Sequence, residues 1–518
     1  MLEQGKIEFG EIDAKHEVFT QNRMGQDIFF RSYLIPPGVN EFQLMQGGRF
    51  FIVGQKGSGK TALMLYLRER YRRNGHKNDI VLFKSDLTED QRQRLISGTD
   101  MSVIEAIESA QKGVDYKTNW LWYILVHISY LLDSHDVMSG QDYLEDFKIL
   151  TGADRRPKQS IFSGLRLSKL KGDITSGLAA GPFKTSVKAE VEAILEDKDK
   201  PEIDVIEAAE RCLAQIKLKP SKRVALFFDE LELFTTQEDQ RSRDIYLIRD
   251  LLYAVGRINR KIGVDSASIV VYASVRSEVL DEVNLFGDEV NKDIDDFGVK
   301  LNWDVRSDSQ NQPIIQLIAD KIIASEVEDG QDASEDVWKT YFPAHLFGKD
   351  IRQYLLDISM FRPRNLVRRL NSAKMHKDHE GFILEDFEES QLDFSIGVWK
   401  EIEDELRAVY EPAVARAVKS FLSGFQSRFY LNELETRIMK STHVASGIRN
   451  QFAPKEAIVR LLEILYRSGA IGNTFLVEAR GKREARDRWS FRGYSEPLFD
   501  KQFVIHESLR KALQLPFN

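Results

Sequence analysis

The chain has 518 residues, more than one hydrophobic core usually accommodates, so we expect two to four domains. Hydrophobic residues make up 42% of the chain and charged residues 30%, which excludes fibrous, low-complexity and largely disordered classes. The formal net charge of -8 excludes a chain that binds nucleic acid through its overall charge, so any such role needs a local basic patch.

Cysteine content and hydropathy narrow the class further. Cys212 is the only cysteine, which excludes an intrachain disulfide framework or a thiolate-rich zinc site, and we expect it to be a buried helix residue. The segment Met1–Lys6 lacks the residue order of a signal peptide. The longest apolar run, Trp120–Leu132, is too short to span a bilayer and predicts a buried helix. These observations predict a cytoplasmic protein with no membrane segment.

Apolar runs that alternate with helical patterns predict an α/β fold. In chain order they are a strand at Arg49–Val53, a helix at Thr61–Arg73, strands at Asp79–Phe83 and Arg223–Phe228, a helix around residues 245–262 and a strand at Ser268–Ala273. Such alternation is typical of a parallel sheet with helices on both faces.

The spacing of these elements and the patterns outside them predict the domain boundaries. Far more residues lie between the second and third strands than one crossover helix needs, and this insertion includes the Trp120–Leu132 helix and a Gly-interrupted stretch at Ser160–Val191 that could form a small antiparallel element. The predicted domains are an N-terminal flank (1–48), a P-loop core (49–86 and 221–300), an insertion (87–220), a helical lid (301–400) and a winged-helix-like domain (401–518).

Residues Gly54 to Thr61 carry the P-loop pattern Gly-x-x-x-x-Gly-Lys-Thr between a predicted strand and a predicted helix. The glycines let backbone N–H groups point at phosphate oxygens, and the helix adds the positive end of its dipole. We expect Lys60 to reach the β- and γ-phosphates and Thr61 to offer its hydroxyl to Mg2+. The predicted nucleotide-binding residues are Gly54, Gln55, Lys56, Gly57, Ser58, Gly59, Lys60, Thr61 and Ala62.

The run Val224–Phe228, followed by Asp229 and Glu230, has the Walker B pattern of an apolar strand that ends in two acids. We expect Asp229 to hold Mg2+ through water and Glu230 to orient or deprotonate the attacking water. Two acids at a strand end are common by themselves, and the P-loop upstream is what favours the functional interpretation. The pair predicts hydrolysis as well as binding.

The nucleotide base follows by exclusion. A GTPase would show Asp-x-x-Gly, but Asp229 is followed by Glu230-Leu231-Glu232, and Asn291–Ile294 lacks the final acid of Asn-Lys-x-Asp. A transporter-type signature is also missing, because Met138–Gln141 lacks one of its glycines. ATP with Mg2+ is therefore the predicted ligand.

Two further pairs of residues are candidates for contact with the γ-phosphate. Ser274 and Arg276 follow a predicted strand, where they could sense the phosphate from between the two Walker strands, unless they form only a structural strand end. Arg362 and Arg364 flank Pro363 at a predicted helix start, and arginine can clamp phosphate bidentately. Either arginine could close over the nucleotide from a helical lid, and the alternative is a solvated basic helix end.

The order of P-loop, acidic strand end, polar strand end and Arg-Pro-Arg helix resembles the additional-strand P-loop ATPases, specifically the AAA+ and STAND branches. More narrowly, Phe9–Glu17, Lys56–Thr61 and Arg362–Asn365 look like a poorly characterised bacterial group often found in mobile or phage-defence loci. The insertion leaves open which branch applies. The resemblance implies a homo-oligomer and an arginine finger supplied in trans.

Two amphipathic helices in the segments Leu431–Met439 and Lys455–Gly472, the second capped by glycine, precede an expected hairpin with strands at Asn473–Val477 and Trp489–Arg492. This order resembles a winged helix, against which Phe503–Arg510 should pack. The basic residues between the expected strands that could contact DNA are Arg480, Lys482, Arg483, Arg486 and Arg488. A solvated loop, or a surface that binds protein, is the alternative.

These patterns predict an ATPase that acts as a conformational motor or switch, linked to DNA or to antiviral defence. The alternative is a nucleotide-gated scaffold that holds a separately encoded partner protein with little turnover.

Overall fold

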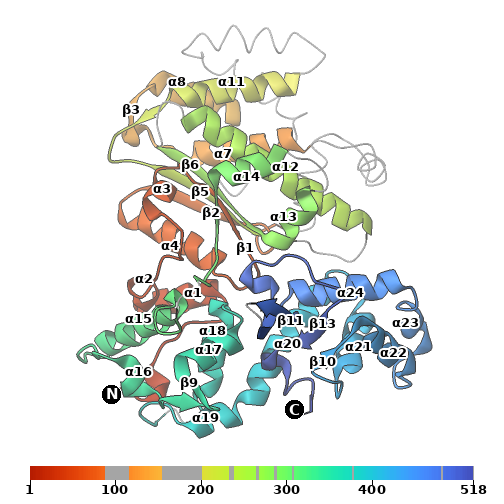
Figure 1. Ribbon diagram of the computed structural model, residues 1–518. Coiled ribbons are helices and arrows are strands. Elements are labelled where there is room, and N and C mark those ends of the chain that lie inside the picture. Colours follow the sequence, from red (N-terminus) through yellow and green to blue (C-terminus); the bar gives the residue numbers. More distant parts are fainter. Residues whose placement is uncertain are drawn as a thin grey trace. The chain divides into compact units, whose positions relative to one another are not determined.

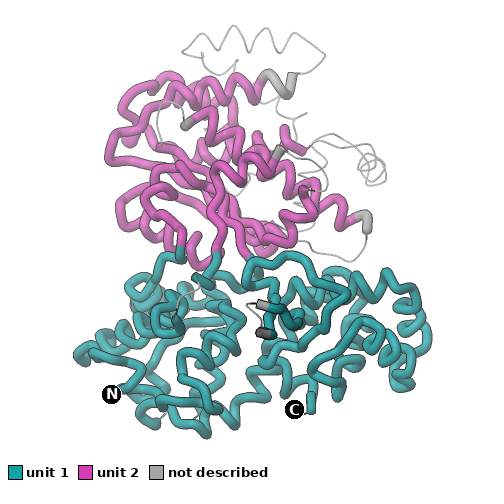
Figure 2. The backbone as a smooth tube through the Cα atoms, in the orientation of Figure 1, with its two compact units in different colours: residues 1–37, 55–59, 302–518 teal, residues 38–54, 60–301 magenta. Residues whose placement is uncertain are grey.

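The computed structural model describes residues 1–87, 116–153, 201–232, 238–263, 268–284, 289–305, 308–375, 378–479 and 482–516. The chain forms two compact units (Figure 2). Unit 1 contains residues 1–37, 55–59 and 302–518, and unit 2 contains residues 38–54 and 60–301. The expected antiparallel element within 160–191 lies outside the described residues.

The centre of unit 2 is a five-stranded parallel sheet (Figure 1). Its strands are β1 (Phe51–Gly54), β2 (Lys77–Leu82), β5 (Val224–Leu231), β6 (Ile269–Arg276) and β7 (Gly298–Lys300). The order is β2-β5-β6-β1-β7, and every pairing is parallel. The predicted parallel sheet is confirmed, and the strand that ends in polar residues lies between the P-loop strand and the acidic strand.

Two consecutive aromatic residues of β5 show that helices cover both faces of this sheet. Side chains alternate along a strand, so Phe227 and Phe228 point to opposite faces. Phe227 packs against Tyr71 of α4 (Lys60–Arg73), and Phe228 packs against Trp120 of α7 (Lys117–Leu131). The predicted buried helix at Trp120 is confirmed, and it covers the sheet.

The other elements of unit 2 surround this layered core. They are α3 (Glu41–Met45), η2 (Ser134–Asp136), β3 (Val137–Ser139), α8 (Gln141–Thr151), α11 (Pro201–Gln215), β4 (Lys217–Leu218), α12 (Glu238–Gly263), α13 (Ser277–Asn284) and α14 (Glu289–Phe297). Strands β3 and β4 pair antiparallel, which the sequence did not predict because so few residues carry no readable alternation. Cys212, on α11, is buried as expected.

Asn259 of α12 fixes the helix against β6. Its Nδ2 donates to the Val271 carbonyl at 2.7 Å, and its Oδ1 accepts from the Val271 N–H at 2.9 Å. Pairing of β6 with β1 begins only at Ala273. The buried amide therefore supplies the hydrogen bonds that a neighbouring strand would supply further along.

Unit 1 is mainly helical before residue 425. Its elements in this part are η1 (Gln4–Lys6), α1 (Ala14–Met24), α2 (Ile28–Arg31), α15 (Pro313–Glu328), α16 (Val337–Tyr341), β8 (His345–Leu346), β9 (Lys349–Asp350), α17 (Ile351–Ser359), α18 (Pro363–Ala373), α19 (Leu384–Glu389), α20 (Gln391–Arg407) and α21 (Pro412–Leu422). One hydrophobic cluster runs from Leu2 through these helices to Leu515. The predicted boundary between residues 400 and 401 falls inside α20.

The C-terminal part of unit 1 contains three helices and a four-stranded sheet. The elements are β10 (Arg428–Phe429), α22 (Leu431–Lys440), α23 (Ser446–Asn450), α24 (Lys455–Arg467), β11 (Ile471–Ala479), β12 (Lys482–Arg488), η4 (Ser490–Arg492), β13 (Gln502–Ile505) and η5 (Glu507–Leu509). The strand order is β10-β13-β11-β12. As expected, the segment after residue 502 packs on this part, because β13 pairs with β10 and β11.

One predicted strand of this hairpin was wrong. We expected Trp489–Arg492 to pair with the strand that begins near Asn473, but Ser490–Arg492 forms the 3-10 helix η4. The basic segment itself forms β12, and its partners on β11 run from Asn473 to Ala479. A charged strand is tolerated here because β12 is at the sheet edge, where charges discourage pairing with other chains.

None of the helices in the described ranges combines the length and hydropathy that are needed to cross a membrane.

Candidate functional site

Asp229 and Glu230 lie on a β-bulge at the carboxyl end of β5. The pairing of β5 with β6 changes register between Phe228 and Leu231. Glu230 has a φ of 59°, a left-handed backbone that is uncommon for a residue with a side chain. Bulges re-aim side chains, and strained residues cluster at functional sites. The two predicted acids therefore have different partners.

Asp229 is held by the neighbouring strand. Its side chain is buried, with 1% of the residue exposed, and its Oδ1 accepts a hydrogen bond from Ser274 Oγ. Its Oδ2 has no hydrogen-bond partner among the residues that the structure describes. A buried carboxylate oxygen without a donor is unfavourable unless a cation or a water bound to one completes it. Asp229 and Ser274, predicted separately, thus come together.

The oxygen atoms of Asp229 and Thr61 suit Mg2+ better than they suit a metal ion that protein side chains alone must hold. No group of three or more His, Cys, Asp or Glu side chains within the described ranges is arranged to hold a metal ion. Mg2+ usually keeps several waters and takes one or two carboxylates together with phosphate oxygens. Asp229 fits that pattern, and Thr61 is partly buried in the first turn of α4.

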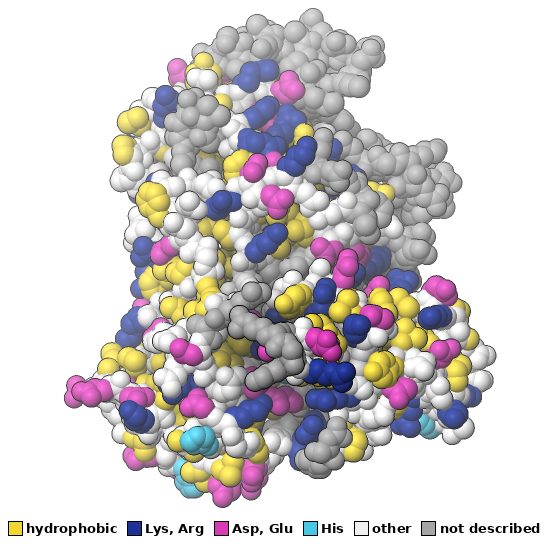
Figure 3. Space-filling model, in the orientation of Figure 1, with side chains coloured by type: hydrophobic (Ala, Val, Ile, Leu, Met, Phe, Trp, Pro, Cys, Tyr) yellow, Lys and Arg dark blue, Asp and Glu magenta, His cyan; other side chains and the backbone are white. Residues whose placement is uncertain are grey.

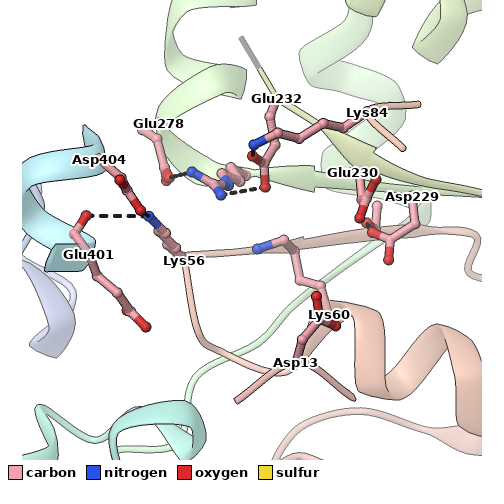
Figure 4. A network of polar contacts seen from close by, with 12 residues as sticks. Asp13, Lys56, Lys60, Lys84, Asp229, Glu230, Glu232, Glu278, Glu401 and Asp404 are labelled. Carbon is pink, nitrogen blue, oxygen red and sulfur yellow. Dashed lines mark hydrogen bonds and ion pairs between the residues drawn. The ribbon is translucent and has the colours of Figure 1, made fainter. Parts of the chain in front are cut away.

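Glu230 is held by the turn that follows β2. Its Oε2 accepts hydrogen bonds from the Ser85 N–H at 2.9 Å and from Ser85 Oγ at 2.7 Å. The Phe83 N–H donates to the Asp229 carbonyl at 2.9 Å. The same turn carries Lys84, whose Nζ lies 3.3 Å from Glu232 Oε2 (Figure 4). The turn at residues 83–86 therefore positions the end of β5.

Arg276, the predicted sensor at the end of β6, contacts acids of its own unit. One guanidinium nitrogen pairs with Glu232, and another lies 3.8 Å from Glu278 Oε1. Contact of Arg276 with a phosphate stays a prediction. Glu232, Glu278, Lys84 and Ser85 were missed as site residues because nothing in the local pattern distinguishes them from ordinary surface residues.

Lys60 has a perturbed ammonium group. Its Nζ donates to the Gly54 carbonyl at 2.9 Å. Burial lowers the pKa of Lys60 to about 8, and the charge of Arg276 lowers it further, whereas Glu278 and Asp229 act in the opposite direction. A phosphate would favour the charged form of this lysine.

The central residues of the P-loop segment, 55–59, belong to unit 1. Gly57 and Gly59 have φ values of +80° and +94°. A Cβ on Gly57 would lie 3.3 Å from Arg364 Cβ, so the glycine is needed for both its backbone conformation and this close approach. The Ser58 carbonyl accepts from Trp303 Nε1 at 2.9 Å, while the buried Ser58 Oγ has no partner within the described part of the chain.

Arg362 and Arg364 lie against this segment at the start of α18, where Pro363 occupies the first turn as predicted. Arg362 Nη2 donates to Gln55 Oε1 at 3.3 Å, and the Arg364 N–H donates to the Gly57 carbonyl at 3.4 Å. Arg362 is only 7% exposed, and its Nε has no partner among the described residues. Both arginines thus contact residues of the 55–59 segment, and the predicted closure of Arg362 or Arg364 over a nucleotide stays a prediction.

A neutral histidine lies near the charge of Arg362. Burial lowers the pKa of His506 to about 3, and the nearby charges of Arg362, Lys349 and Arg492 lower it as well. His506 Nδ1 is 2.9 Å from Ser508 Oγ, a local contact that supports a structural role for this side chain.

The basic residues predicted for DNA contact are partly paired within the hairpin. Arg486 pairs with Glu484 at 2.7 Å, and Arg483 lies 3.8 Å from Glu478. Arg488 donates to the Glu496 carbonyl at 3.1 Å. The residue Arg480 and the side chain of Lys482 lie outside the described part. On the face shown in Figure 3, basic side chains of unit 1 lie among acidic ones.

Comparison with known proteins assigns one segment to a family. Residues 313–403 match the family described as the FunZ-associated C-terminal helical domain. The matched segment contains α15 to α19 and most of α20, and therefore Arg362 and Arg364. No curated protein matches the chain. The chain is similar to the crystal structure of Cdc6p from Pyrobaculum aerophilum, with 10% identity over 94% of this chain and 96% of that chain, but at a TM-score of 0.30 this similarity carries no argument.

Proposed function

We propose that this protein is a Mg2+-dependent ATPase that uses hydrolysis as a conformational motor or switch. The observation that carries the proposal is the edge of the parallel sheet in unit 2. There the buried Asp229 carboxylate accepts from Ser274 and keeps one oxygen without a donor among the described residues, and the field of Asp229 acts on the Lys60 ammonium. A cation and a polyphosphate are the ligands that these two groups would each favour.

In this proposal each residue has one role. Lys60 neutralises the β- and γ-phosphates, and the backbone N–H groups of residues 54–62 bind phosphate oxygens. Asp229, through water, and the Thr61 hydroxyl would hold Mg2+, which would supply charge neutralisation on the phosphates. Glu230 orients or deprotonates the attacking water, which requires its carboxylate to leave or share the contact with Ser85.

Arginines of unit 1 and of β6 are further candidate phosphate ligands in this proposal. Arg362 is buried without an acidic partner and its Nε lacks an acceptor in the described part of the chain, so a phosphate oxygen is a suitable ligand. Arg364 lies over Gly57. Arg276 and Ser274, at the end of β6, would detect the γ-phosphate. An arginine from a second copy in a homo-oligomer is implied only by the family resemblance.

We propose further that the C-terminal part of unit 1 is a winged-helix-like module through which the ATPase meets its partner. Its order of α21, β10, α22, α24 and the β11–β12 hairpin supports this. If the partner is DNA, affinity should fall with salt and on neutralising Arg483 and Arg486. A link to antiviral defence remains a prediction that follows from the resemblance.

A second function is favoured by specific contacts. Arg483 and Arg486 of β12 are paired with acids, and Leu476 on β11 is 65% exposed, which suits a protein partner better than a phosphate backbone. The contact of Glu230 with Ser85 also occupies one oxygen of the proposed base. The alternative is therefore a nucleotide-gated scaffold that holds a partner protein with little turnover.

The test is ATP turnover and ATP binding by the purified chain and by Glu230→Gln. The proposal predicts turnover in the wild type and, in Glu230→Gln, retained binding with a loss of at least about 100-fold in turnover. Glu335→Gln, an exposed change in unit 1, is the matched control and should behave as wild type. Tight binding without turnover in the wild type would favour the scaffold, and absence of both would reject the proposal.

A further inference from the structure

Two arginines on one face of α18 share a single carboxylate on α20. Arg364 and Arg368 are four residues apart, so they lie one helical turn from each other on the same face. Arg368 Nη2 pairs with Glu401 Oε1, and Arg364 Nη1 lies 4.0 Å from the same oxygen. The side chains of Arg368 and Glu401 are only 15% and 14% exposed, so solvent screens this pair weakly.

Helix α20 is shaped to receive Arg368. Gly397 precedes Glu401 by one turn, and a Cβ on Gly397 would lie 2.7 Å from Arg368 Nη1 and 3.0 Å from its Cδ. Glycine destabilises a helix interior relative to alanine, so its presence here calls for a reason. The passage of Arg368 across α20 supplies that reason.

The P-loop segment contributes a further cation, Lys56, which contacts the main chain of α20 at Glu401. Lys56 Nζ donates to the Glu401 carbonyl at 3.3 Å and lies 3.9 Å from Asp404 Oδ2 (Figure 4). Asp404 is largely exposed, whereas Glu401 is nearly buried. The carboxylate of Glu401 therefore lies between two arginines and makes its short contact with Arg368, while Lys56 binds the main-chain carbonyl of the same residue.

We propose that Arg368 is a positioning residue that occupies the Glu401 carboxylate and so keeps Arg364 over Gly57. This inference rests on the proposed function, in which Arg364 binds a phosphate of ATP. Arg364 Nε donates to the Ile12 carbonyl at 3.1 Å, and its Cβ faces Gly57. Without Arg368, Glu401 Oε1 becomes the strongest acceptor near Arg364 and draws its guanidinium from the phosphate.

The effect of Glu401→Gln on the KM of Arg368→Gln distinguishes a positioning role of Arg368 from simple packing. Arg368→Gln leaves Glu401 charged and should raise the KM for ATP about tenfold with less change in kcat. Glu401→Gln in the same chain removes the competing charge, so the double variant should recover most of the wild-type KM. If Arg368 only packs α18 against α20, the double variant should be at least as impaired as Arg368→Gln.

The experiment measures kcat and KM for ATP with Mg2+ in the full chain for both single variants and the double variant. Arg407→Gln, which breaks a similar arginine–glutamate pair with Glu403 on α20, is the matched control and should leave KM unchanged. Gly397→Ala provides a second route, because it displaces the Arg368 guanidinium without removing a charge, and should raise KM in the same direction.

Three results bear on the inference. Recovery of KM in the double variant supports it. A double variant no better than Arg368→Gln, or an unchanged KM in both Arg368→Gln and Gly397→Ala while Lys60→Ala abolishes turnover, overturns it and leaves the proposed function standing. A wild-type chain that neither binds nor hydrolyses ATP overturns both.

Discussion

The sheet edge of unit 2 and the start of α18 in unit 1 differ in the charge of their buried groups without partners. At the sheet edge that group, among the described residues, is an acceptor, Asp229 Oδ2, while Asp229 Oδ1 and Glu230 Oε2 accept from Ser274 and Ser85. At the start of α18 the described atoms without a partner are a donor of a cationic side chain, Arg362 Nε, and a neutral acceptor, Asn365 Oδ1. By charge, Asp229 suits a cation and Arg362 suits an anion.

The difference also indicates how each region depends on ligand. Buried polar groups without partners destabilise a fold, and a ligand that completes them adds stability in proportion to its binding. We therefore expect Mg2+ to act mainly through Asp229 and the nucleotide mainly through Lys60 and the arginines. Four predictions test this division of roles between the metal ion and the nucleotide.

The largest expected effect comes from Lys60→Ala, which removes the ammonium from the P-loop. Loss of the charge that neutralises the phosphates should reduce ATP turnover about 1,000-fold and weaken binding. Turnover and binding of a fluorescent ATP analogue measure it, with the exposed Lys300→Ala as control. Wild-type turnover in Lys60→Ala would refute the nucleotide site.

Asp229→Asn should have the next largest effect. The amide oxygen can still accept from Ser274, but the negative charge that attracts the cation is lost. Turnover should fall about 100-fold, and half-maximal turnover should need more Mg2+. A Mg2+ titration of turnover checks this, and an unchanged Mg2+ requirement would place the metal elsewhere.

Arg362→Met tests the anion region. Methionine fills a similar volume without a buried charge, so unfolding of the nucleotide-free chain should occur at an unchanged or higher temperature. Affinity for ATP should fall about tenfold, because a charge-assisted hydrogen bond is lost. Thermal unfolding with and without ATP measures both effects. A variant that unfolds earlier yet keeps the full shift with ATP would assign Arg362 a purely structural role.

The smallest expected effect is a proton taken up on binding. Since the pKa of Lys60 is lowered to about 8, part of the nucleotide-free chain carries a neutral lysine at pH 8, and the phosphates restore the charge. Binding at pH 8 should take up about half a proton, less at pH 6.5, and kcat/KM should decline as pH rises through 8. Calorimetry in buffers of different ionisation enthalpy detects the uptake. Equal proton uptake at pH 6.5 and pH 8 would exclude Lys60 as its source.

Sequence reasoning predicted the parts of the site that depend on local pattern. The β1–loop–α4 unit around Gly54 and the acidic end of β5 follow from apolar runs, glycines and charges close together in the chain. The strand that ends in Ser274 and Arg276 was expected between the two Walker strands, and the order β5-β6-β1 confirms this place for β6.

The parts it missed depend on tertiary contacts or on weak patterns. Ser85 lies 145 residues from Glu230 in the chain, and no sequence pattern identifies a serine that donates hydrogen bonds to so distant a carboxylate. Glu401 and Arg368 belong to different helices, so their pairing leaves no local sequence pattern. From the sequence alone, Gly397 is only a residue of low helix propensity, and its role depends on the Arg368 side chain that packs against it. The strand β12 was missed because its charges are typical of a loop, whereas an exposed sheet edge accepts them.

The amide of Asn259 has a further consequence for motion within unit 2. Because it binds both backbone groups of Val271, α12 cannot slide along β6 by even one residue without breaking two buried hydrogen bonds. Ser274 and Arg276 follow Val271 on the same strand. A displacement of the strand end in response to a γ-phosphate would therefore move α12 together with β6.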